Sequence, residues 1–200
     1  MMDHSPHALY EYQPSFILGF HGCDRETGER ILNGAEMHLK PSEKDYDWLG
    51  HGIYFWEGNV SRAWEWACDG QAAGRIRTPF VIGAIIDLRH CLDLFDREAI
   101  RQVSKAYETT KATFERDGIP LPANIGATPD KARRILDCTV MNMLHRVRAN
   151  IDQPAYDSIR GPFLEGEPIY AGAGFRSHTH IQICVREISC IKGYFRPLAA

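Results

Sequence analysis

The sequence predicts one α+β domain over residues 1–200. Short apolar segments typical of strands stand near both ends and in the middle of the chain, whereas long helical patterns are collected between about residues 96 and 150. Strands and helices therefore do not alternate as they do in a doubly wound sheet. The sequence also lacks the GxGxxG and GxxxxGK[ST] patterns, so any nucleotide would be bound without a Rossmann unit or a P-loop.

Each element is predicted from its hydrophobic period and from residues that favour its ends. Apolar runs of four to ten residues predict strands, and charged stretches with apolar residues every three or four positions predict helices. Residues 1–14 are polar and are expected to lie loosely on the surface, and residues 158–177 are glycine-rich and are expected to form a loop. In chain order, we expect a strand over 15–22, a helix between Asp24 and Gly34, a strand over 51–55, a helix capped by Asn59 or Ser61, a strand over 79–88, a helix over 96–118, a helix capped by Thr128 with Pro129 at its first position, and one bent strand or two strands over 179–195.

The composition is that of an ordinary soluble chain, with 44% apolar and 24% charged residues. A net charge of −3 argues against a generally basic surface for nucleic acid, although a local basic groove is compatible with it. The six cysteines form no CxxC pair, which predicts reduced, buried thiols rather than a zinc site. No signal peptide and no apolar run of 18 residues is visible, so we expect a cytoplasmic protein with no membrane contact.

The stretch "GFHGC", residues 19–23, is the first candidate for chemistry. His21 stands at the end of a predicted buried strand, so its ring is expected to point into a cleft there. Gly22 lets a ligand approach the backbone, whose N–H and C=O can pair with a carboxamide. The alternative is a packed core histidine beside a turn glycine.

The stretch "GHGIYFWEGNVSRAWEWA", residues 50–67, concentrates glycine and aromatic residues. Gly50 and Gly52 allow tight backbone conformations, and the Tyr54 ring can stack on a flat heteroaromatic ligand. The alternative is a hairpin with core aromatics. Trp64 and Trp66 are about 200° apart on a helix, so at least one of them is expected to point away from the core.

The stretch "SHTHIQICV", residues 177–185, has two different faces if it forms a strand. One face is apolar and is expected to pack on the core, and the other is expected to face a cleft or solvent. Two histidines two residues apart can begin a metal site, but a third ligand is lacking, so we expect no metal. The polar face carries His178, His180, Gln182 and Cys184, and the apolar face carries Thr179, Ile181, Ile183 and Val185.

Taken in order and with their spacing, these stretches resemble the ADP-ribosyltransferases of the diphtheria-toxin and poly(ADP-ribose) polymerase type, whose signature is His-Tyr-Glu. The resemblance covers about residues 15–90 and 160–195. It implies a split β-sheet core, in which the block of about 96–150 is a helical insertion. It also implies that His21 holds the ribose of NAD and that Gly22 grips the nicotinamide carboxamide through its backbone. Cys23 stands where the family usually has Ser or Thr.

The resemblance further assigns the nicotinamide ring to a sandwich beside Gly52. Tyr54 takes the place of the stacking tyrosine, and Trp66, with Trp64 as the alternative, covers the other face. Arg160 and Arg176 flank the late glycine-rich region and are candidates for phosphate contacts.

Gln182 falls where the family has its catalytic glutamate. Glutamine keeps the hydrogen bond to the ribose but not the negative charge that stabilises the reacting anomeric carbon. Polymer synthesis is therefore not expected. His180 or Glu165 are the candidates to assist, whereas strand alternation places Glu187 on the wrong face.

The resemblance thus implies an NAD-dependent mono-ADP-ribosyltransferase, a glycosyltransferase that passes ADP-ribose to a protein or nucleic-acid acceptor. By analogy, a domain of this kind is expected to be a bacterial or phage toxin or effector, and an antitoxin or immunity protein is then a candidate partner. Four alternatives stay open: a catalytically silent module that binds NAD or ADP-ribose, an NAD glycohydrolase, an RNA 2′-phosphotransferase on a related fold, and a hydrolase with a Cys23–His pair.

Overall fold

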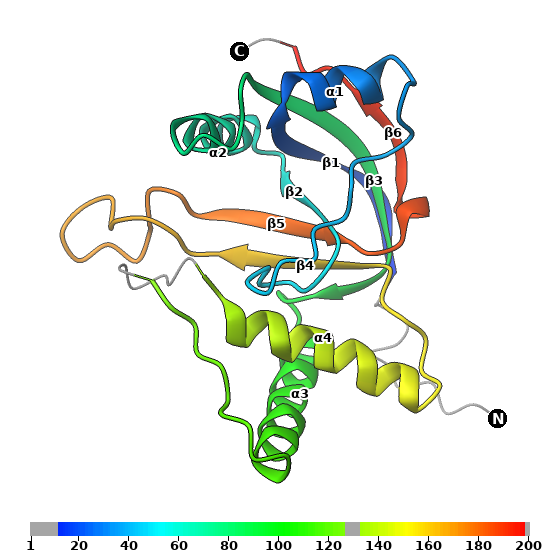
Figure 1. Ribbon diagram of the computed structural model, residues 1–200, viewed down its shortest axis with the longest axis vertical. Helices are drawn as coiled ribbons and strands as arrows, with labels where there is room; N and C mark the ends of the chain where they lie inside the picture. The colour runs from blue at the N-terminus through cyan, green and yellow to red at the C-terminus, as the bar shows by residue number, and fades with distance from the viewer. Residues whose placement is uncertain (1–11, 127–132, 199–200) are drawn as a thin grey trace.

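The computed structural model describes residues 12–126 and 133–198, and within them six strands form one mixed sheet (Figure 1). The strands are β1 (Tyr12–Asp24), β2 (Ile53–Glu57), β3 (Pro79–Asp93), β4 (Ser158–Phe163), β5 (His180–Val185) and β6 (Ile191–Phe195). Their order is β1-β2-β5-β4-β3-β6, and β1 also pairs with β3. The first five strands of that order therefore close into a ring. This confirms the predicted α+β class.

The helices lie on different sides of the strands (Figure 1). The bounds are α1 (Arg25–Leu32), α2 (Val60–Ala72), α3 (Arg97–Arg116) and α4 (Ile135–Asn150). Helix α1 lies near β1 and β6, whereas α3 and α4 pack together below β4 and β5. The caps predicted for α1 and α2 are confirmed, because the side chain of Asp24 accepts from the N–H of Glu26 and that of Asn59 from the N–H of Arg62.

Several predicted boundaries were wrong. Residues 12–14 belong to β1 rather than to a loose end, and β3 continues to Asp93. The predicted loop over 158–177 begins with strand β4. Its sequence SIRGPF contains a glycine and a proline, which are uncommon inside strands, and it was therefore predicted as a loop. Thr128 and Pro129 lie outside the described residues, and α4 begins only at Ile135.

The core is divided between the two faces of the sheet. Ile183 and Val185 pack on one face with Phe55, which confirms the predicted apolar face of β5. The opposite face was expected to meet a cleft or solvent, but its Cys184 is fully buried against α3 and α4. The helical block therefore shares a core with the sheet. All six cysteines are free, and five of them are buried, as predicted.

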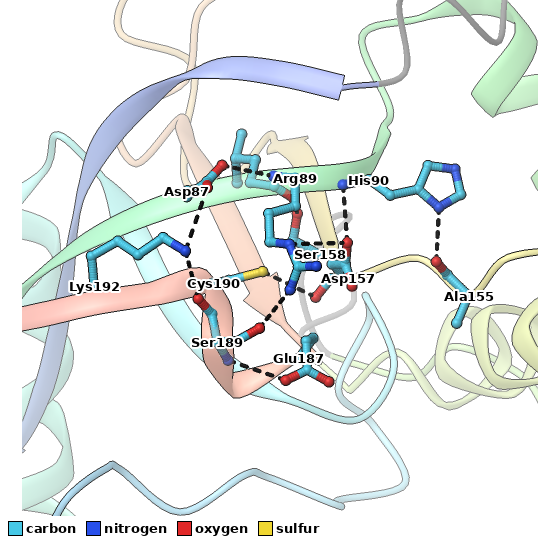
Figure 2. Close-up of polar contacts among 11 residues, drawn as sticks. Asp87, Arg89, His90, Ala155, Asp157, Ser158, Glu187, Ser189, Cys190 and Lys192 are labelled. Carbon is cyan, nitrogen blue, oxygen red and sulfur yellow. Dashed lines mark hydrogen bonds and ion pairs between the residues drawn. The ribbon is translucent and has the colours of Figure 1, made fainter.

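A polar network holds β3 where it changes partner from β6 to β4 (Figure 2). Arg89 has a positive φ of 51° at this point and donates to the hydroxyl of Ser189. Asp157, just before β4, accepts from the backbone N–H of His90. Lys192 lies 3.5 Å from a carboxylate oxygen of Asp87. These contacts fix the crossing that closes the ring of strands.

No helix in residues 12–126 and 133–198 is long and apolar enough to cross a membrane.

Candidate functional site

Strands β1 and β2 separate at His21. Their ladder ends with the pair Phe20↔Trp56, and the next contact is made by a side chain. His21 Nδ1 lies 2.7 Å from the carbonyl oxygen of Tyr54. A carbonyl only accepts hydrogen bonds, so Nδ1 carries the proton and donates it. The imidazole thus satisfies the carbonyl at the point where the strands part.

Gly22 is buried, and its backbone is directed toward the edge of β1 from which β2 has separated. The carbonyl of Leu18 accepts from the N–H of Gly58 beside β2, and alternate residues of a strand direct their backbone groups to the same edge. The N–H and C=O of Gly22 therefore point away from β3. A Cβ at Gly22 would lie 2.3 Å from the carbonyl oxygen of Ala63, so only glycine fits so close to α2.

A cleft of about 470 Å³ adjoins His21, within the range typical of small-molecule sites. It is formed by the end of β1, by α1 and by the segment that follows α1. Its lining residues are His21, Glu26, Thr27, Arg30, Glu36, Leu39 and Lys40. Burial lowers the pKa of His21, so the ring is neutral at pH 7 and its free Nε2 is a hydrogen-bond acceptor.

The two tryptophans of α2 have different surroundings. The Trp66 ring lies 6.4 Å from the ring of His21 and 5.9 Å from that of Trp56, whereas Trp64 is 47% exposed. The expectation that at least one of the pair points away from the core is confirmed. Trp66 is the one beside Gly22.

Tyr54 shares the sheet face of Trp56, but its ring lies toward α3 and α4 rather than toward Trp66. The ring packs in the cluster shared with α3 and α4, and its hydroxyl donates to the carbonyl of Gly50 at 2.7 Å and accepts from the N–H of Leu49 at 3.0 Å. Trp66 belongs to a separate cluster. In this structure Tyr54 therefore contributes its backbone carbonyl to the His21 site, and the two rings do not form a sandwich.

Gln182 lies in register with Trp56 on β2 and with Gly161 on β4. Its Oε1 accepts a hydrogen bond of 2.5 Å from Nε1 of Trp48. The Trp48 ring also covers Gly161, where a Cβ would lie 3.0 Å from the ring. Trp48 was not among the predicted site residues, although it lies only two positions before Gly50.

A row of aromatic rings connects His21 with the neighbourhood of Gln182. Successive ring centroids are 5.0–6.4 Å apart, within the range of aromatic contacts. The members of this ring row are, in order, His21, Trp66, Trp56, His180, Phe163 and Trp48. The predicted residues His21 on β1 and His180 on β5 are therefore linked by a continuous row of ring contacts.

His180 lies inside this row rather than facing solvent, and its side chain is 1% exposed. Glu165, predicted to reach the cleft, has a carboxylate oxygen 3.9 Å from His180 Nδ1 and 2.8 Å from a guanidinium nitrogen of Arg62. His178 precedes β5 and is exposed. Within the described residues no group of three histidines, cysteines or carboxylates is placed to hold a metal.

The remaining candidate residues have other interactions in the structure. Arg160 donates to both carboxylate oxygens of Glu57 and lies 3.2 Å from Asp93, so we no longer expect it to bind phosphate. Arg176 donates to a loop carbonyl. Cys23 is buried in the core, and burial raises the pKa of its thiol to about 12, which argues against a Cys–His nucleophile.

Glu187 accepts from the N–H of Ser189 and begins the short 3-10 turn Ile188–Cys190. It lies beyond the end of β5, so the strand alternation that was expected to place it on the wrong face does not apply to it.

Comparisons with known proteins add little to this geometry. No family model matches the sequence, and no solved structure matches the chain. Over 47 residues, the chain is 43% identical to an uncharacterized protein of Methanocaldococcus jannaschii. The match covers 24% of this chain and 21% of that protein, so the chain spans about a fifth of its relative.

Proposed function

We propose that the chain is an NAD-dependent mono-ADP-ribosyltransferase, which breaks the nicotinamide–ribose bond of NAD and passes ADP-ribose to a macromolecular acceptor. The observation that carries the proposal is the opening between β1 and β2. There, His21 holds the carbonyl of Tyr54, and the backbone of Gly22 faces the gap beside a cleft of about 470 Å³.

The nicotinamide end of NAD matches this opening chemically. A carboxamide carries one acceptor and one amino donor group, which are complementary to the N–H and C=O of a single residue, here Gly22. Trp66 supplies an aromatic surface next to it. The free Nε2 of neutral His21 accepts from a ribose hydroxyl.

The adenosine diphosphate end is assigned to the cleft along α1. Arg30 and Lys40 line that cleft and can donate to a pyrophosphate, beside the carboxylates of Glu26 and Glu36. Arg30 now pairs with Glu36 at 2.8 Å, an exposed ion pair that costs little to exchange for a phosphate. These two residues replace Arg160 as the expected phosphate ligands.

Gln182 favours a second candidate, a silent module that binds NAD or ADP-ribose. Its amide accepts from Trp48 Nε1 and brings no negative charge to the ring row. Without a carboxylate, bond cleavage loses electrostatic stabilisation, and a single lost group of this kind typically costs about 10²–10³ in rate. An NAD glycohydrolase is the third candidate, and in that case water is the acceptor.

A matched pair of variants on α2 tests the proposal. Trp66→Ala is expected to weaken NAD binding about 5- to 150-fold, since base–aromatic stacking contributes about 1–3 kcal/mol. Trp64→Ala, on the exposed side of the same helix, is expected to bind NAD as the wild type does. Binding is measured by calorimetry. Equal affinity of both variants, or no NAD binding by the wild type, contradicts the proposal.

A further inference from the structure

Three buried polar atoms belong to neighbouring side chains, those of Trp56 and His180 on the sheet face that carries Gln182 and that of Arg62 on α2. Trp56 Nε1, Arg62 Nε and His180 Nε2 have no hydrogen-bond partner among the residues that the structure describes. Trp56 is 5% and His180 6% exposed. Their ring centroids are 6.2 Å apart, and the guanidinium carbon of Arg62 lies 5.8 Å from the Trp56 ring centroid. Unsatisfied groups this deeply buried call for an explanation.

The protons on these atoms can be assigned. The indole Nε1 and the guanidinium Nε are donors. His180 Nδ1 lies 2.6 Å from the carbonyl oxygen of His178, and a carbonyl only accepts, so Nδ1 holds the proton. Nε2 of the neutral ring is therefore a bare acceptor. The cluster offers two donors and one acceptor.

This set is complementary to a neutral hydroxyl group, which accepts two hydrogen bonds and donates one. An ammonium or guanidinium group has no acceptor for the two donors, and an ionised carboxylate or phosphate has no donor for His180. We propose that Trp56, Arg62 and His180 form an acceptor subsite for a hydroxyl group, and that Nε2 of His180 removes its proton.

The assignment rests on the proposed function, in which the hydroxyl group belongs to an alcohol rather than to water. The bond between nicotinamide and C1′ of the ribose breaks, and its electron pair leaves with nicotinamide. The hydroxyl oxygen forms the new bond to C1′, and its proton passes to His180 Nε2. The subsite is part of the ring row, which contains both Trp56 and His180, and Trp56 lies directly opposite Gln182 in the sheet.

The surroundings of His180 keep its ring neutral and able to accept a proton at neutral pH. Burial is the main cause that lowers its pKa, and Arg62 and the ring of His178 lower it further. The hydrogen bond to the backbone of His178 and the carboxylate of Glu165 act in the opposite direction. The ring is consequently free to take a proton at pH 7, and Glu165, 3.9 Å from Nδ1, stabilises the charged ring that results.

Two substitutions separate the functions of the two ring nitrogens. In His180→Asn the side-chain amide can still donate to the carbonyl of His178, but nothing reaches the place of Nε2. In His180→Gln the side-chain oxygen can accept near that place, but it cannot take up a proton. Trp64→Ala serves as the control. NAD affinity is measured by calorimetry, nicotinamide release by chromatography, and transfer to added methanol as O-methyl ADP-ribose by mass spectrometry.

We expect both His180 variants to bind NAD within about threefold of the wild type and to form O-methyl ADP-ribose about 10²–10⁴ times more slowly, the usual contribution of a general base. Because the pKa of His180 is lowered, the wild-type rate should be constant around neutral pH and decline only in the acid range, and both variants should lack this decline. Variants that form the product within threefold of the wild type, with the same pH profile, overturn the subsite. A wild type that binds NAD but forms no product also overturns it and leaves the silent module. A wild type that does not bind NAD overturns the proposed function and the subsite together.

Discussion

His145 on α4 is expected to make the stability of the protein depend on pH. Its side chain is buried, and neither ring nitrogen has a hydrogen-bond partner among the described residues. Burial, helped by the positive charges of Arg186 and Arg148, lowers its pKa from 6.5 to about 3. The unfolded chain therefore takes up a proton near pH 6.5, whereas the folded chain stays neutral to about pH 3.

The sign and size of the pH effect on stability follow from the difference between the pKa of His145 in the folded and in the unfolded chain. The contribution of His145 is fully present above pH 6.5 and is lost progressively as the pH falls toward 3. Each pH unit below 6.5 lowers the free energy of unfolding by about 1.4 kcal/mol, so the loss reaches about 2 kcal/mol at pH 5. A total stability of about 5–15 kcal/mol is usual for a domain, so this loss is readily measurable.

Urea unfolding of the wild type and of His145→Leu at pH 7.5 and pH 5 measures the effect. His21 and His180 also have lowered pKa values and contribute in the same direction in both proteins, so the comparison isolates His145. The wild type should lose about 2 kcal/mol more than the variant between the two pH values. Equal losses would show that the His145 ring is hydrated or hydrogen-bonded, and would refute the reasoning.

Three further predictions concern the site and its frame. Gly22→Ala should lower the free energy of unfolding by about 3 kcal/mol in a thermal melt, because the new Cβ would lie 2.3 Å from the Ala63 carbonyl; an unchanged melting temperature would contradict the packing against α2. Gln182→Glu should accelerate nicotinamide release at least about tenfold, since Trp48 Nε1 can hold the carboxylate beside the ribose; a slower variant would place Gln182 outside the reaction. Arg160→Ala should cost about 2 kcal/mol of stability in urea by leaving two carboxylates unpaired, but NAD affinity should not change, and a loss of affinity would restore Arg160 as a phosphate ligand.

Local patterns sufficed for the first half of the fold. The apolar runs predicted β1 and β3, and the caps Asp24 and Asn59 placed the starts of α1 and α2, because these signals depend on neighbours in sequence. Strand β4 could not be predicted in this way. Its Gly161 is required by the Trp48 ring, a contact between residues far apart in the chain.

In the candidate site, too, local patterns were predictable and contacts between distant residues were not. Spacing brought His21, Gly22 and Trp66 into one hypothesis, and the structure places them together. Alternation correctly put His180 and Gln182 on one face of β5, but it gave no sign that this face is buried. That burial depends on rings from β2, β4 and the segment before β2, which only the folded chain brings together. The pairing of Arg160 with Glu57 was hidden for the same reason.

The central claim is that the opening at His21 binds and cleaves NAD, and nicotinamide release from NAD by the purified protein tests it most directly. The assay is run with and without cell lysate, beside His21→Ala. We expect release by the wild type that increases with lysate, with labelled ADP-ribose on an acceptor, and loss of release in the variant. Release that continues unchanged in His21→Ala, or a wild type that neither binds nor cleaves NAD, would contradict the account.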